Sequence, residues 1–101
     1  MNDRSRIAIL AIEDEDILRN NIVSYLEDSG YAVSEAANGR TGLEMFRRHQ
    51  PDLVLLDLRM PEMGGLEVLG EIRKESPDTP VIIVSGTGNI IDAIEAIHLG
   101  A

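Results

Sequence analysis

Three segments of this sequence place oxygen-bearing side chains directly after a run of apolar residues. Glu13 and Asp14 follow the apolar run at residues 7–12, and Asp57 follows the run at residues 53–56. Ser85 follows the run Val81–Val84. Apolar runs without alternation are typical of strands that are covered on both faces, as in a parallel sheet between helices. Because open α/β sheets bind ligands at the carboxyl ends of their strands, we expect chemistry where these runs end. A single strand-end Asp is more often just solvated, so this expectation requires the segments to meet.

The carboxylates predict a site for a hard divalent cation. In a flavodoxin-like sheet with strand order 2-1-3-4-5, the first, third and fourth strands are neighbours. Glu13, Asp14 and Asp57 would then share one crevice, with Ser85 beside them. Carboxylates held so close repel one another, which raises their pKa values and costs stability. A cation offsets the repulsion, and oxygen ligands that leave room for water suit Mg²⁺ best.

Elements that would position these groups follow from hydrophobic periodicity and from turn residues. We expect strands at residues 7–12, 31–36, 53–56 and 81–84, and helices at residues 16–28, 65–74 and 90–99, with a further helix that contains Leu43 and ends near His49. Asn38 and Gly39 are expected to turn the chain before that helix. Strands and helices alternate with short connections, which predicts an α/β fold with a doubly wound parallel sheet.

Composition excludes several classes of function. The 101 residues suit one small domain, and 18 acidic against 9 basic residues give a net charge of −9, which argues against direct binding to nucleic acid. The absence of cysteine excludes disulfides and thiol chemistry. No apolar run is long enough to cross a bilayer and no secretory signal is present, so we expect a soluble cytoplasmic protein without membrane contact.

The chain resembles the receiver domain of bacterial two-component response regulators. The resemblance rests on IAILAIEDEDILR, LVLLDLRMPEMGG and PVIIVSGTGN, in which the acid pair, the Asp-x-x-Met-Pro motif and the strand-end Ser have the order and spacing of the family. It implies a signalling switch that is turned by phosphorylation and catalyses only its own phosphotransfer and dephosphorylation. The donor would be a phosphohistidine on a sensor histidine kinase or a histidine phosphotransfer protein.

The resemblance also implies a role for each site residue. Asp57 would be the phosphoacceptor. The Mg²⁺ ligands would be Asp14 directly, Glu13 largely through water, Asp57, and the backbone carbonyl of Arg59. Glu13 stands where the family often has Asp, and its longer side chain extends the reach to a bridging water.

The same resemblance implies roles for Ser85, Arg59 and Thr87 near the phosphoryl group. Ser85 would supply the switch hydroxyl, moving toward the phosphoryl group once it arrives. Arg59 and Thr87 would flank the phosphoryl group and tune its hydrolysis, and we expect the bulky Arg59 to slow it.

The resemblance implies five β-α units, of which this sequence contains four. The fifth strand of the family, with its aromatic residue and its Lys, would follow Ala101, so the family lysine is absent from this sequence. We therefore expect residues 1–101 to be a C-terminally incomplete receiver domain of a protein that continues, or else a partner chain to cover the edge of Val81–Val84. Many receivers dimerise through the missing surface, so the sequence leaves open whether this protein forms a homodimer.

Two alternatives fit part of the pattern. A pseudo-receiver would keep the fold as a binding module without taking phosphate; the missing lysine favours it, and the intact carboxylates argue against it. A small Mg²⁺-dependent phosphatase would resemble an Asp-x-Asp pattern after the first strand, with the nucleophile there. Residues 13–16 instead read Glu-Asp-Glu-Asp, and the lone Asp57 follows the third strand. The sequence does not reveal the cognate kinase, the output domain or the regulated process.

Overall fold

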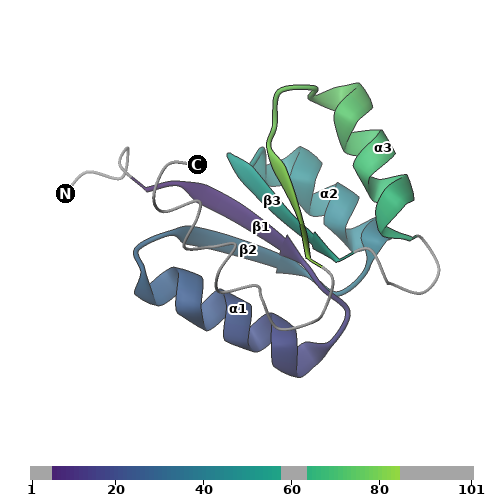
Figure 1. The fold of residues 1–101 in the computed structure, drawn as a ribbon. Helices are drawn as coiled ribbons and strands as arrows, with labels where there is room; N and C mark the ends of the chain where they lie inside the picture. The colour runs from purple at the N-terminus through teal and green to yellow at the C-terminus, as the bar shows by residue number, and fades with distance from the viewer. Residues whose placement is uncertain (1–5, 58–63, 85–101) are drawn as a thin grey trace.

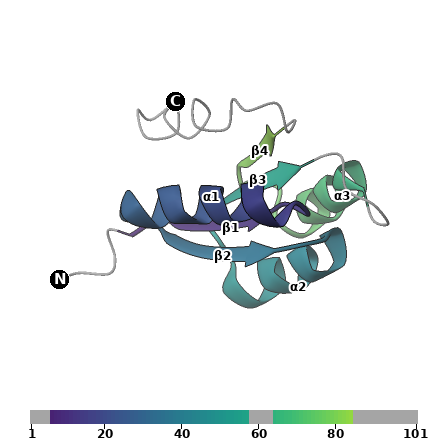
Figure 2. The same ribbon diagram turned by 90° about the horizontal axis from the view of Figure 1, so that it is seen from below.

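The computed structural model describes residues 6–57 and 64–84 of the chain. Strands and helices alternate along these residues, in the order β1 (Ala8–Ile12), α1 (Asp16–Asp28), β2 (Ala32–Ala36), α2 (Gly39–His49), β3 (Leu53–Asp57), α3 (Gly65–Glu75) and β4 (Val81–Val84). The strands are parallel and form one sheet in the order β2-β1-β3-β4, which Figure 2 shows. This is the flavodoxin-like doubly wound arrangement that the alternation of elements predicts.

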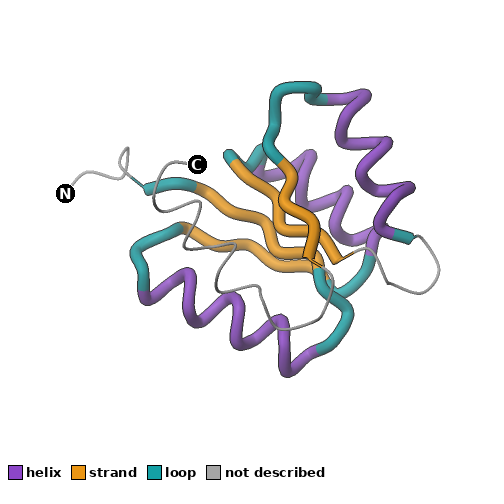
Figure 3. The backbone as a smooth tube through the Cα atoms, in the orientation of Figure 1, coloured by secondary structure: helices purple, strands orange, loops and turns teal. Residues whose placement is uncertain are grey.

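The helices cover both faces of the sheet. Helix α1 lies on one face, and α2 and α3 lie on the other (Figures 1 and 3). Successive residues of β1 therefore enter different cores: Ile9 and Ala11 pack on the side of α1, and Leu10 and Ile12 pack on the side of α2 and α3. All four are almost completely buried. Burial on both faces explains why the strand sequence shows no apolar and polar alternation.

Strand register brings the carboxyl ends of β1 and β3 together. Ile12 of β1 is opposite Leu56 of β3, so the next residues along the two strands, Glu13 and Asp57, emerge side by side. Asp57 is in turn opposite Val84, the last residue of β4. The ends of these neighbouring strands therefore form one edge on which side chains can meet.

Helix α2 begins earlier than its apolar residues indicate. The expected turn at residues 38–39 is instead a helix cap, in which the Asn38 side chain accepts a hydrogen bond of 2.8 Å from the Thr41 amide. The first turn of α2 contains no large apolar residue, so hydrophobic periodicity does not reveal it. Gly42 in this turn lies against β1, because a Cβ placed there would come within 2.7 Å of Ile12 Cδ1.

Strand β4 pairs with β3 alone among the residues that the structure describes. Val84 is buried, whereas Ile83 is 40% exposed. The expected helix at residues 90–99 lies outside the described residues. No helix in the described ranges has the length and apolar character that crossing a bilayer requires.

Candidate metal centre

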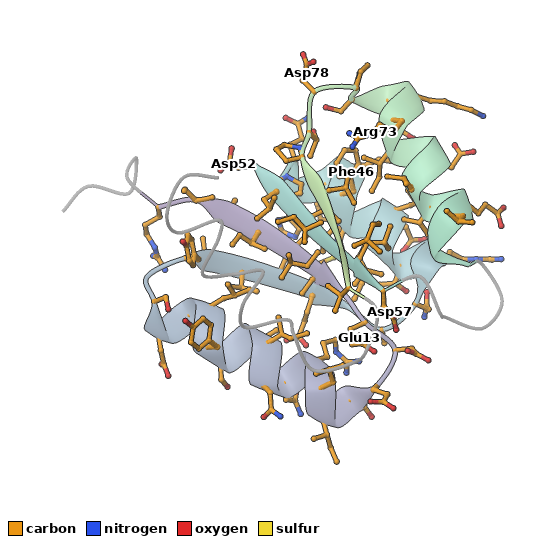
Figure 4. The ribbon with its side chains drawn as sticks, viewed as in Figure 1. Glu13, Phe46, Asp52, Asp57, Arg73 and Asp78 are labelled. Atoms are coloured by element: carbon orange, nitrogen blue, oxygen red, sulfur yellow. The ribbon has the colours of Figure 1, made fainter. Side chains whose placement is uncertain are left out.

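Glu13, Asp14 and Asp57 converge at the carboxyl edge of the sheet. Each offers one carboxylate oxygen, and the three oxygens lie within 4.8 Å of one another. Figure 4 shows Glu13 and Asp57 next to each other, at the end of β3 opposite to Asp52. Glu13 and Asp14 follow β1 and Asp57 ends β3, so two neighbouring parallel strands supply the whole cluster.

The cluster is largely shielded from water. Glu13 is 3% and Asp57 is 5% exposed, and Asp14 is partly buried. The pKa of Glu13 is raised from 4.5 to about 7, mainly because burial disfavours the charged form, and a hydrogen bond from the Glu15 amide opposes this rise. Repulsion from Asp57, and hydrogen bonding of Glu13 with Asp57 and Asp14, contribute to the same rise. Negative charge is therefore concentrated where water does little to stabilise it.

One oxygen of Glu13 lacks a hydrogen-bond donor. Its Oε2 accepts a hydrogen bond of 3.1 Å from the Glu15 amide, whereas its Oε1 is buried with no partner in the described part of the chain. A buried carboxylate oxygen is costly unless it is paired or coordinates a metal. With two further carboxylates close by, the donor set is all oxygen and strongly negative. The residues present therefore fit a hard cation such as Mg²⁺.

The backbone of this loop is fixed by contacts on two sides. The Glu13 amide donates a hydrogen bond of 3.0 Å to the Ala36 carbonyl of β2. The Glu13 carbonyl accepts a hydrogen bond of 2.9 Å from Nη1 of Arg19, which lies in the first turn of α1. The sequence does not mark Arg19 as functional, because a charged residue on a helix usually lies on the solvated face. Arg19 lies in the sequence between the acidic residues 13–16 and 27–28, and this position does not reveal which atoms its side chain contacts.

Three of the residues that the sequence singles out cannot be placed. Ser85, Thr87 and Arg59 lie outside the described residues, so their expected roles stay predictions. Gly64 and Gly65, which follow the segment of Arg59, are described: Gly64 precedes α3, and α3 begins at Gly65.

A hollow of about 460 Å³ lies away from the carboxylates. It is formed by residues at the ends of α2 and α3, which are Phe46, Arg47, Gln50, Pro51, Glu75, Ser76 and Thr79. These residues precede β3 and β4, so the hollow is at the amino edge of the sheet. It contains an ion pair between Arg47 and Glu75, and neither carboxylates in a cluster nor a buried unpaired oxygen. The chemistry of the molecule is therefore better sought at the carboxyl edge.

The chain is similar in sequence to known proteins. The sequence model of the response regulator receiver domain matches residues 9–101. The regulatory protein AtoC of Escherichia coli (strain K12) is 40% identical over 93 residues, which are 92% of this chain and 20% of that protein. The probable transcriptional regulator ycf27 of Porphyridium aerugineum is 42% identical over 93 residues, which are 92% of this chain and 38% of that protein.

Solved structures with similar sequences also share the fold of this chain. The response regulator receiver domain protein of Clostridium thermocellum has a TM-score of 0.76 and 37% identity, covering 94% of this chain and 77% of that one. NtrX of Brucella abortus has a TM-score of 0.77 and 35% identity, covering 95% of this chain and 22% of that one.

The curated relatives are longer than the matched region, since this chain spans only 20% of AtoC and 38% of ycf27. The similarity therefore identifies a domain and leaves the activity of a whole protein open. The family match covers nearly the entire chain, and the order of the strands and the acidic cluster at their carboxyl ends agree with it. This chain belongs to the response regulator receiver domain family, whose members act in two-component signalling.

Proposed function

We propose that Asp57 accepts a phosphoryl group in a reaction that requires Mg²⁺, and that residues 1–101 belong to one receiver domain with this site. The observation that supports the proposal best is the buried cluster of Glu13, Asp14 and Asp57, with an unpaired oxygen on Glu13. A cluster of this kind is unfavourable when empty, and it is suited to a site that binds a cation and a phosphoryl group together.

Asp57 is the nucleophile in this proposal. One of its carboxylate oxygens forms a bond to phosphorus while the bond between phosphorus and the imidazole nitrogen of a phosphohistidine breaks. The imidazole leaves with the electron pair of that bond, and Asp57 becomes an acyl phosphate.

The metal would be held by Asp14 and Asp57 directly, by Glu13 through water and by the carbonyl of Arg59. When bound, Mg²⁺ neutralises the phosphoryl oxygens and aligns them, which supplies most of the catalysis such a transfer needs. Burial of Glu13 and Asp57 keeps bulk water from competing for this cluster.

Residues outside the described ranges complete the proposed switch. Ser85 donates its hydroxyl hydrogen bond to the phosphoryl group and thereby moves the segment that follows β4. Arg59 and Thr87 flank the phosphoryl group and set how fast water removes it.

The phosphodonor in this proposal is a sensor histidine kinase or a histidine phosphotransfer protein. This is supported by the family, whose members act in two-component signalling. ycf27 is described as a probable transcriptional regulator, and AtoC as a regulatory protein. We propose that the present domain likewise controls an output, and that homodimerisation is one way in which it could do so.

Incubation with Mg²⁺ and acetyl phosphate tests this function against its alternatives. A receiver gains one phosphoryl group that hydroxylamine removes, as expected of an acyl phosphate, and the Asp57→Asn variant gains none. A pseudo-receiver gains none in either form, and a phosphatase hydrolyses added phosphate esters repeatedly. Absence of labelling in the unsubstituted protein that binds Mg²⁺ would favour the pseudo-receiver.

A further inference from the structure

We propose that Arg19 is a positioning residue of the metal centre, which holds the backbone of Glu13 so that the carboxylates of Glu13 and Asp14 face Asp57. The inference rests on the proposed function, because it assumes that these carboxylates bind Mg²⁺. Arg19 itself contributes no ligand atom. It would act by fixing the loop between β1 and α1.

The Arg19 guanidinium joins three separate parts of the fold. Its Nη1 donates to the Glu13 carbonyl at 2.9 Å, its Nη2 to Asp16 Oδ1 at 2.7 Å, and its Nε to Glu35 Oε1 at 3.0 Å. The acceptors belong to the residue that follows β1, to the start of α1 and to the strand β2. The Arg19 side chain is only 14% exposed, whereas the Asp16 side chain is 79% exposed. Arg19 is thus enclosed by the segments that it connects.

The contact with the Glu13 carbonyl bears directly on the metal ligands. This carbonyl belongs to the peptide group that joins Glu13 to Asp14, so its orientation sets the directions in which both side chains leave the backbone. The amide of Glu13 is held by Ala36, and Arg19 reaches Glu35, the neighbour of Ala36 in β2. Both peptide groups of Glu13 are therefore tied to the end of β2, one directly and one through Arg19.

Geometry and charge make opposite predictions for Mg²⁺ affinity. A guanidinium close to a cation site repels the cation, so the loss of its charge alone should strengthen Mg²⁺ binding. Loss of the backbone contact should weaken binding, because the carboxylates would no longer be held together against their mutual repulsion. Residues that orient metal ligands without touching the metal typically change affinity by about 10–100-fold. The sign of the change therefore separates a positioning role from a purely electrostatic one.

Isothermal titration of metal-free protein with Mg²⁺ measures this sign. We expect the Kd to rise about 10-fold in Arg19→Gln. In Arg19→Lys we expect a several-fold rise, because lysine keeps the charge and cannot span three acceptors as the guanidinium fork does. The matched control is Arg47→Gln, which breaks a two-point ion pair with Glu75 at the other edge of the sheet. Its Kd should stay within about 2-fold of the original value, because coupling between distant sites is small.

Hydrogen exchange of the Glu13 amide gives a readout that needs no metal. In EDTA, where the metal is removed, this amide should exchange about 10-fold faster in Arg19→Gln, since a hydrogen bond to a charged group is worth about 1.5 kcal/mol or more. The Ile9 amide should exchange faster only to the extent that the substitution lowers the global stability. Urea unfolding in EDTA measures that global stability. A general loss of stability would accelerate both amides together.

The outcomes are distinguishable. If Arg19→Gln does not fold, Arg19→Lys replaces it, because it keeps the positive charge and changes only the geometry of the contacts, and a several-fold rise in Kd is expected. Mg²⁺ binding that is unchanged or tighter in the folded Arg19 variant would overturn the positioning role while leaving the proposed function intact. If the unsubstituted protein does not bind Mg²⁺, the proposed function fails, and this inference with it.

Discussion

Glu13 should make the metal-free protein less stable as the pH rises. Its pKa is about 7 in the folded protein against an ordinary value of 4.5, so between these values the folded state binds more protons than the unfolded state. The contribution of Glu13 to the stability of the folded state is therefore most favourable below about pH 4.5 and decreases as the pH approaches 7. Above that pH, the contribution of Glu13 does not change further. We expect the loss to be on the order of 1–3 kcal/mol.

Urea unfolding in EDTA at about pH 5 and about pH 8 measures this loss when the protein is compared with Glu13→Gln, which carries no ionisable group at this position. The difference in stability between the two proteins should shift in favour of Glu13→Gln at the higher pH. An identical pH dependence in both proteins would show that burial of the Glu13 charge is not unfavourable.

Arg59→Asn should shorten the lifetime of the phosphorylated protein by several-fold. The prediction follows from the proposal that bulky Arg59 shields the acyl phosphate from water. Phosphate release from purified phosphoprotein after removal of the donor measures the lifetime. An unchanged half-life would contradict the shielding role of Arg59 while leaving phosphorylation itself unaffected.

The proximity of Glu13, Asp14 and Asp57 could be predicted from the sequence because it follows from a simple rule. Parallel strands end at one edge, so strand-end residues of neighbouring strands meet. The contact between Arg19 and the Glu13 carbonyl could not be predicted in this way, because it depends on the rotamer of a long side chain and on a bond to backbone. Neither leaves a pattern of residue types in the sequence.

Two helical glycines should respond in opposite ways to alanine. A Cβ at Gly42 would lie 2.7 Å from Ile12 Cδ1, and Ile12 is 1% exposed and packed in the core, so it has little room to move. Overpacking should outweigh the gain in helix propensity, and we expect Gly42→Ala to destabilise the protein by about 1 kcal/mol.

Gly70 in α3 is the matched control, because nothing lies within 4 Å of a Cβ at that position. Gly70→Ala should stabilise the protein by about 0.5–1 kcal/mol through helix propensity alone. Urea unfolding of both variants under the same conditions checks the pair. Equal stabilisation by the two substitutions would contradict the close approach of α2 to β1.

Elements with strong hydrophobic signals were predicted best. The bounds of α1 and of Val81–Val84 agree with those expected from the sequence, and the buried run at β3 is confirmed. The start of α2 was not predicted, because its first turn is fixed by the cap at Asn38 and by the close packing of Gly42, and neither contributes a large apolar residue. Local polar contacts thus decide boundaries that periodicity does not mark.

Binding of Mg²⁺ should stabilise the whole molecule, since the cation offsets repulsion that is present only when the chain is folded. At a Mg²⁺ concentration of about 100 times the Kd, the free energy of unfolding should increase by about 2.7 kcal/mol. Thermal unfolding over a series of Mg²⁺ concentrations measures the effect, at constant ionic strength so that general screening of the net charge of −9 does not contribute. If the double variant Asp14→Ala, Asp57→Ala showed the same rise in Tm with Mg²⁺ as the unsubstituted protein, binding at this site would be contradicted.

At the scale of the whole molecule, topology was the most predictable property. Alternating strands and helices with short connections leave few arrangements, and the order β2-β1-β3-β4 is the expected one. The family followed from three motifs in their correct order, and it is confirmed by the match over residues 9–101.

Borohydride trapping tests the central claim most directly, because it reduces an acyl phosphate of aspartate to homoserine and so records its position in a peptide map. After incubation with acetyl phosphate and Mg²⁺, we predict homoserine at position 57, and none in EDTA or in Asp57→Asn. Homoserine at another aspartate, or at position 57 to the same extent in EDTA, would contradict a Mg²⁺-dependent phosphoacceptor site built by Glu13, Asp14 and Asp57.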